Sequence, residues 1–276
     1  MIKNYLILLR PVNFIITALS IVVSCLLAGG TVPHDFLPIF FSSLGGALIA
    51  GGGMVINDII DVDIDKINKP HRPIASGAVD KFDAYMFYAG LSGAGLIMSY
   101  HASWNAFLIA LSALPVIFMY SYWLKGTPLA GNFIVAFLTG LTFIYGGAAV
   151  GNFSKAVMPA VFAFLINVPR EIIKDMEDIE GDAKNKIKTF PVLYGMKPSA
   201  VLASFFLLAV IGSTVIPFMN GMYGIRYFVT VNLGVNTVLL FVLFSLWKDQ
   251  STKNLNRLST IVKWDMLAGL LAIYLG

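Results

Sequence analysis

Long apolar segments, separated by shorter polar ones, run along almost the whole chain. Each is close to the roughly 20 residues that a helix needs to cross a hydrocarbon core of about 30 Å. Because lipid offers no hydrogen bonds to an open backbone, helices are the expected structure of such segments. The pattern predicts an all-α polytopic membrane protein with nine transmembrane helices, at residues 11–29, 36–56, 83–100, 104–124, 130–150, 156–173, 199–217, 224–247 and 258–275.

The composition agrees with a membrane protein. Of the 276 residues, 58% are hydrophobic and 12% are charged, whereas soluble domains carry roughly a quarter charged residues. The N-terminal sequence lacks a small-residue cleavage site and leads directly into an apolar segment, so no cleaved signal peptide is expected. The lone Cys25 permits neither an internal disulfide nor a CxxC metal site. The modest net charge of +4 is better explained by loop topology than by a nucleic-acid partner.

The basic residues are distributed very unevenly over the predicted loops. Of the 19 Lys and Arg residues, only Lys155 and Arg226 fall on the side opposite the N-terminus. Positively charged loops stay in the cytoplasm, so the chain is expected in the cell membrane with its N-terminus and its charged loops inside. No obligate protein partner is evident, and the expected surroundings are membrane lipids.

Most of the acidic residues fall in two short segments, each after the end of an apolar segment. Asp58, Asp61 and Asp65 stand in the pattern DxxDxxxD, and the same spacing returns in Asp175, Asp178 and Asp182. On a helix these positions share one face. Crowded carboxylates repel one another and are costly near a membrane. Because Mg²⁺ is commonly held by one or two carboxylates together with substrate phosphates, the clusters predict a magnesium-bound diphosphate.

Basic residues accompany both clusters and could bind phosphate. Arg72 stands between two prolines that restrict its backbone, and Lys125 ends the fourth predicted span. Arg and Lys donate charge-assisted hydrogen bonds to phosphate oxygens. We therefore expect Arg72 and Lys125 to contact the diphosphate. The three histidines show neither a zinc-ligand spacing nor a Ser-His-Asp arrangement.

These motifs resemble a known family. Asn57-Asp58 with Asp61 and Asp65, followed by Asn68-Lys69-Pro70 and Arg72-Pro73, is similar to the first signature of the UbiA superfamily of intramembrane prenyltransferases. The second cluster and Leu9-Arg10-Pro11-Val12-Asn13 fit the same family, and residues 170–182 resemble its archaeal members that make ether lipids. The resemblance covers nearly the whole chain, so it implies one domain over residues 1–276, with the nine helices around a central cavity.

The resemblance also implies a reaction and a set of site residues. Geranylgeranyl diphosphate would donate its prenyl group to the hydroxyl of geranylgeranylglyceryl phosphate, a lipid-phosphate acceptor, in a Mg²⁺-dependent reaction on the cytoplasmic side. The implied metal ligands are Asn57, Asp58, Asp61, Asp65, Asp175, Asp178 and Asp182. The implied catalytic residues are Asp61, Asp65, Asp178, Asp182, Arg72 and Lys125. Further substrate-binding residues are Tyr120, Asn132, Arg10, Asn13, Lys69, Arg170, Lys174 and Lys188.

Two alternatives remain open from the sequence. One is a prenyltransferase that acts on an aromatic or quinone-precursor acceptor. The other is an ion-coupled transporter, since transporters often contain internal repeats. The ionisable residues of transporters usually lie near the middle of the membrane, whereas here they gather at helix ends, so the enzyme is favoured.

Overall fold

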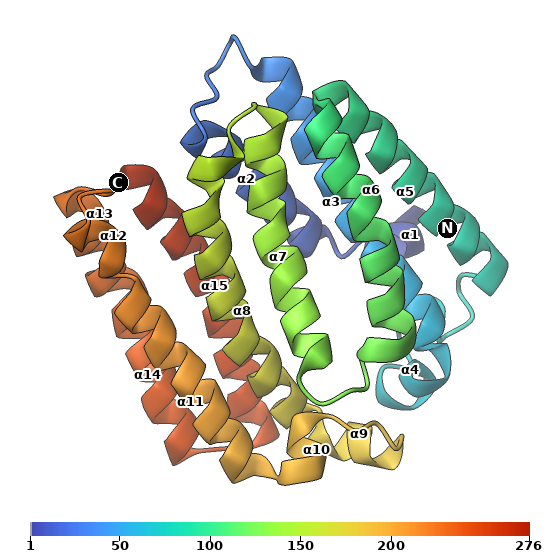
Figure 1. Ribbon diagram of the computed structural model, residues 1–276. Coiled ribbons are helices and arrows are strands. Elements are labelled where there is room, and N and C mark those ends of the chain that lie inside the picture. Colours follow the sequence, from blue (N-terminus) through green and yellow to red (C-terminus); the bar gives the residue numbers. More distant parts are fainter. Residues whose placement is uncertain (1) are drawn as a thin grey trace. The chain divides into compact units, whose positions relative to one another are not determined.

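The computed structural model describes residues 2–276, apart from the side chain of Asn68, and within this range it contains helices and no strand (Figure 1). The first half of the chain forms α1 (Ile2–Leu8), α2 (Pro11–Leu27), α3 (Phe36–Ile60), α4 (Val62–Asn68), α5 (Lys81–Ala102), α6 (Trp104–Met119), the π-helix η1 (Tyr120–Leu124) and α7 (Ala130–Ala149). The second half forms η2 (Phe153–Ala156), α8 (Val157–Glu177), α9 (Ile179–Lys184), α10 (Phe190–Tyr194), α11 (Met196–Ser213), α12 (Ile216–Met219), α13 (Ile225–Thr230), the π-helix η3 (Val231–Asn236), α14 (Thr237–Lys248) and α15 (Thr252–Leu275). The prediction of an all-α membrane protein is confirmed.

The prediction of nine spans is not confirmed. Seven helical segments in the described chain are long and apolar enough to cross a membrane, and α1 with α2, bent by 55°, is an eighth candidate. The expected span at 83–100 corresponds to α5, which has 22 residues and is long enough. It is not among the seven because Gly, Ser, Tyr and His residues interrupt its apolar stretch.

Two helices extend further than the apolar pattern predicts. α3 continues to Ile60 and α8 continues to Glu177, whereas the predicted spans end at 56 and 173. Asp58 and Asp175 therefore lie inside these helices rather than after them. The hydrophobic pattern ends early because it registers only apolar residues, while the helical hydrogen bonds continue through the polar turn.

The chain divides into two compact units, and α7 contributes to both. The first unit comprises the chain up to Lys125 together with Leu141–Val157, and the second comprises Gly126–Gly140 and Met158–Gly276. The first unit holds Asp58, Asp61 and Asp65, and the second holds the later three aspartates. The expectation of one domain over the whole chain stays a prediction.

In the first unit, α3 packs along α2 and α5. Glycines permit this close approach, since a Cβ on Gly95 would lie 3.0 Å from the carbonyl oxygen of Gly45, as is common where membrane helices meet. A buried cluster including Leu8, Ile56 and Ile59 fixes the end of α3 against α1 and the loop before α5. The aspartate-bearing end of α3 thus rests on a packed core.

In the second unit, α7 and α8 meet through their aromatic residues and a close backbone contact. The rings of Phe133 and Phe164 stack with centroids 6.2 Å apart, and Gly140 lies against Ala160. At the end of α8, Asn256 of α15 donates to Glu177 over 2.6 Å. α8 is therefore held at both ends, and α9 continues from it (Figure 1).

Candidate active site

The first aspartate motif lies at a break between two helices. Asp61 ends α3 and precedes α4, with φ −78° and ψ 2°, a bridge-region conformation that is frequent at active sites. Its N–H donates to the Asn57 carbonyl over 2.9 Å, and its own carbonyl accepts from Asp65 N–H over 2.8 Å. The helical bonding pattern thus passes through the break. It keeps Asp58, Asp61 and Asp65 on one face, as the spacing predicted, and all three are buried.

Three cations of the same unit pair with these three carboxylates. Asp58 accepts from Arg10 over 2.6 Å and from Arg72 over 2.9 Å. Arg72 also donates to Asp65 over 2.6 Å, and Lys125 pairs with Asp61. Burial raises the pKa of Asp65, and the neighbouring Arg72 acts in the opposite direction. The group is therefore a set of three buried carboxylates balanced by three partly exposed cations.

Unusual backbone conformations position two of the three cations. Arg10 stands at the bend between α1 and α2 with φ 47° and ψ 74°, in the left-handed region that few non-glycine residues adopt. Lys125 follows η1, and its N–H donates to the carbonyl of Tyr120, five residues earlier, over 2.9 Å. Such strain and single-turn π-helices cluster at functional sites. Tyr120, a predicted binding residue, thus contributes through its backbone to the turn that positions Lys125.

The second motif repeats the geometry of the first. Asp178 ends α8 and precedes α9 with φ −88° and ψ 3°. Its N–H donates to Lys174 over 3.0 Å, and its carbonyl accepts from Asp182 over 2.9 Å. The two motifs therefore share spacing, backbone conformation and hydrogen-bond pattern.

Neutral donors contact the second motif. Asn132 of α7 donates to Asp175 over 2.7 Å, which brings together two residues that the sequence selected separately. Thr189 donates to Asp182 over 3.1 Å. Thr189 was not among the residues predicted from the sequence, although its position seven residues after Asp182 matches that of Arg72 after Asp65. That repeated spacing could have identified it.

The remaining predicted residues fall into two groups. In the first unit, Asn13 donates to the sulfur of Met54 on α3 over 3.9 Å, and Lys69 follows α4 as its C-cap. In the second unit, the backbone of Lys188 donates to Gly126 over 3.2 Å, while Arg170 and Lys174 both contact Glu171. Within each unit the structure therefore gathers the predicted residues near that unit's motif.

The donor atoms of the first motif fit a magnesium ion that is shared with a substrate. The buried Oδ1 of Asn57 has no hydrogen-bond partner among residues 2–276, so an oxygen ligand remains in place beside three carboxylates. Within the same range, no three His, Cys, Asp or Glu side chains form a metal-binding group by themselves. Mg²⁺ characteristically takes only one or two carboxylates and completes its shell with water and phosphate oxygens. The arrangement fits such a jointly held ion.

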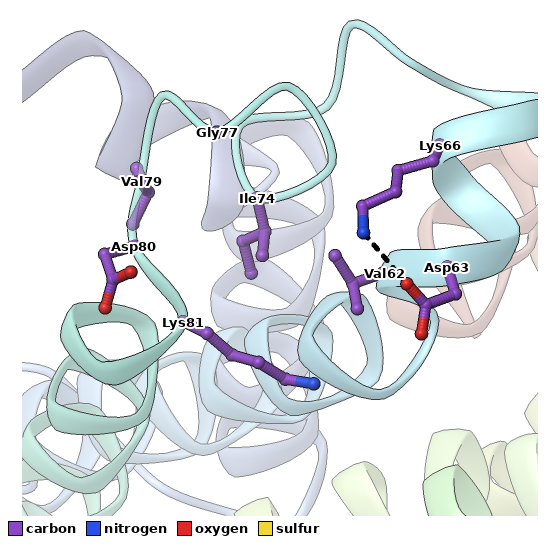
Figure 2. Close-up of a pocket in the computed structure, with 8 residues that line it drawn as sticks. All are labelled: Val62, Asp63, Lys66, Ile74, Gly77, Val79, Asp80 and Lys81. Atoms are coloured by element: carbon purple, nitrogen blue, oxygen red, sulfur yellow. Dashed lines mark hydrogen bonds and ion pairs between the residues drawn. The ribbon is translucent and has the colours of Figure 1, made fainter.

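An open pocket of about 330 Å³ lies beside the other face of α4 (Figure 2). Val62, Asp63 and Lys66 of α4 line it together with Ile74 and Lys81. Asp63 accepts from Lys66 over 2.9 Å, and this contact lowers the pKa of Asp63. None of the predicted site residues lines this pocket. The pocket and the buried Asp65 thus lie on different sides of α4.

Comparison with known proteins identifies the family. The sequence pattern of the UbiA prenyltransferase family matches residues 17–266. This chain belongs to that family. It is thus a membrane prenyltransferase, and the family resemblance inferred from the motifs is confirmed.

Full-length relatives narrow the comparison within the UbiA family. The chain is 37% identical to the digeranylgeranylglyceryl phosphate synthase of Thermococcus gammatolerans, over 95% of this chain and 94% of the relative. It is 36% identical to the enzyme of the same name from Methanopyrus kandleri, over 98% and 97%. A solved structure described as digeranylgeranylglyceryl phosphate synthase in membranes has a TM-score of 0.81 and 30% identity, covering 100% of this chain and 98% of that one.

A more distant UbiA homolog shows the same fold. The Archaeoglobus fulgidus protein, solved with GPP and Mg²⁺, has a TM-score of 0.64 and 19% identity, covering 98% of this chain and 99% of that chain. Its bound groups are properties of that protein. For the present chain the likeness establishes the fold.

Proposed function

We propose that this protein is a digeranylgeranylglyceryl phosphate synthase. It transfers a geranylgeranyl group from geranylgeranyl diphosphate to the free hydroxyl of geranylgeranylglyceryl phosphate, which forms the second ether bond of an archaeal membrane lipid. The observation that carries the proposal is the identity of 36 to 37% with synthases of that name over nearly the full length of both chains. Membership of a prenyltransferase family also favours an enzyme over a transporter.

The cations of the first motif receive the leaving diphosphate. As the bond between the prenyl C1 and the diphosphate oxygen breaks, negative charge develops on that oxygen. Arg72 and Lys125, now paired with Asp65 and Asp61, exchange these carboxylates for phosphate oxygens, which accept charge-assisted hydrogen bonds equally well. Donors already held in place stabilise the developing charge most effectively.

The carboxylates that lose their cationic partners in this exchange become available as metal ligands. Asn57, Asp58, Asp61 and Asp65, together with Asp175, Asp178 and Asp182, would hold Mg²⁺ on the diphosphate. When bound, the metal supplies Lewis-acid neutralisation of the leaving group. Asn132 and Thr189 orient Asp175 and Asp182 for this role.

The bonds and the proton balance without a dedicated protein base. The acceptor oxygen forms its ether bond to C1, and the hydroxyl proton passes to an oxygen of the released diphosphate. The charged motifs face the cytoplasm, as the distribution of Lys and Arg favours. We further propose that α5 is the ninth span, which places the termini on opposite sides of the membrane, and that the whole chain acts as one prenyltransferase domain.

A transfer assay with purified protein tests the proposal. The protein in detergent or lipid receives geranylgeranyl diphosphate with geranylgeranylglyceryl phosphate or with 4-hydroxybenzoate, in Mg²⁺ or in EDTA. The expected product is the diether phosphate, formed only with Mg²⁺. Transfer to the aromatic acid alone would overturn the acceptor while keeping the reaction class. Failure to transfer to either acceptor would overturn the proposed function.

A further inference from the structure

A polar strip runs inward along α8 from the second motif. Asn167, Arg170, Glu171 and Lys174 stand at spacings of three and four residues, so with Asp175 and Asp178 they share one face of the helix. Arg170 lies seven residues before the end of α8 at Glu177, or about 10 Å at 1.5 Å per residue. It is thus inside a candidate membrane span. An ionisable residue at such a depth is costly and usually marks a functional site.

Two cations converge on one buried carboxylate in this strip. Arg170 pairs with Glu171 through Nη1, and Lys174 lies 3.8 Å from the other oxygen of Glu171. The Glu171 side chain is only 9% exposed. Arg170 and Lys174 thus supply two positive charges around Glu171 in the part of the strip that precedes Asp175.

Arg170 is held in place and keeps an unused donor. Its Nη1 lies 3.5 Å from Oδ1 of Asn167. Asn167 directs its oxygen to Arg170 because its amide nitrogen donates to Thr139 Oγ1 over 2.6 Å. The buried Nε of Arg170 has no hydrogen-bond acceptor in the described part of the chain. A planar guanidinium with a free donor suits the forked recognition of a phosphate.

The acceptor presents such a phosphate. Building on the proposed function, we infer that Arg170, assisted by Lys174, binds the phosphate monoester of the acceptor lipid and so makes the enzyme selective for phosphorylated acceptors. Arg10, another predicted substrate-binding cation, is paired with Asp58 in the first motif, among the groups assigned to the diphosphate. Arg170 and Lys174 belong to the second unit and are not assigned to the diphosphate.

Kinetics with paired acceptors test this inference. The wild type, Arg170→Gln, Arg170→Lys and Lys184→Gln are assayed with geranylgeranylglyceryl phosphate and with its dephosphorylated form, geranylgeranylglycerol. Lys184 is an exposed residue of α9 outside the proposed site, so Lys184→Gln is the matched control. We expect Arg170→Gln to lower kcat/KM for the phosphorylated acceptor on the order of 10- to 100-fold, the effect of one or two charged hydrogen bonds. Activity on geranylgeranylglycerol and KM for the diphosphate donor should remain within about twofold.

Arg170→Lys keeps the charge that Glu171 requires, so it tests the inference even where the Gln variant fails to fold. Since lysine lacks the fork, we expect a smaller loss, again confined to the phosphorylated acceptor. Equal losses with both acceptors, or a raised KM for the donor, would overturn the inference and leave Arg170 with a structural or donor-binding role. A wild type that is inactive on geranylgeranylglyceryl phosphate would instead overturn the proposed function itself.

Discussion

Arg72 Nη1 lies 2.6 Å from the Oδ2 of Asp65, a residue seven positions earlier in the chain. The same nitrogen lies 2.9 Å from Asp58, so one guanidinium joins the first and last carboxylates of the motif. A diphosphate that binds Arg72 must therefore compete with both carboxylates for this arginine.

Replacing Arg72 should therefore damage both donor binding and the fold of the motif. Arg72→Ala leaves the buried Asp65 without its cationic partner, so we expect a lower melting temperature and a fall in kcat/KM of at least about 100-fold. Arg72→Lys restores the charge without the fork and should recover part of the thermal stability but little activity. Thermal unfolding and steady-state assays, with Lys66→Gln as a solvent-facing control from α4, measure the two effects. Near-normal activity in Arg72→Ala would remove the arginine from the donor site.

The aspartates at the two helix breaks should be required for turnover and not for folding. Asp61→Asn and Asp178→Asn each remove a ligand charge with almost no change in shape, and we expect activity to fall by more than about 100-fold. Asp63→Asn, on the exposed face of α4, is the control and should be nearly neutral. Full activity in Asp61→Asn or in Asp178→Asn would contradict the assignment of that residue as a metal ligand.

Metal binding should depend on the diphosphate. Asp58, Asp61 and Asp65 are each paired with a cation of the protein, so we expect weak Mg²⁺ binding to the protein alone. Binding should be much tighter with a non-hydrolysable prenyl diphosphate analogue. Isothermal titration with and without the analogue distinguishes the two states. Equally tight binding in both would show a metal site formed by the protein alone.

Thr189 offers a finer test of the second motif. Thr189→Val keeps the side-chain shape and removes the hydrogen bond to Asp182, whose net worth is about 0.5 to 1.5 kcal/mol. We expect a loss of roughly 2- to 10-fold in kcat/KM, which Thr189→Ser should largely restore. A valine variant that matches the wild type would leave the threonine without a role in positioning Asp182.

The two aspartate motifs and Arg72 could be predicted because their information is local. The repeated DxxDxxxD spacing identified six carboxylates, and the helical bonding through Asp61 and Asp178 keeps each set on one face. Contacts between residues far apart in the sequence could not be predicted. The contact of Arg10 with Asp58, for example, depends on a left-handed turn and on the packing of α2 against α3. The count of nine spans stays unconfirmed at α5, where Gly and Ser residues that serve helix packing also lower the hydropathy.

The uninterrupted hydrogen bonding through Asp61 also determines which mutations the first motif can accept. One residue inserted between Asp61 and Asp65 would rotate Asp65 by about 100° around the helix axis. Its carboxylate would then leave the face that it shares with Asp58 and Asp61. A substitution changes one ligand, whereas an insertion or deletion changes the position of every following residue around the helix axis. Natural variants of this enzyme are therefore expected to carry insertions and deletions outside residues 57–65 and 174–182, in the longer connections between helices.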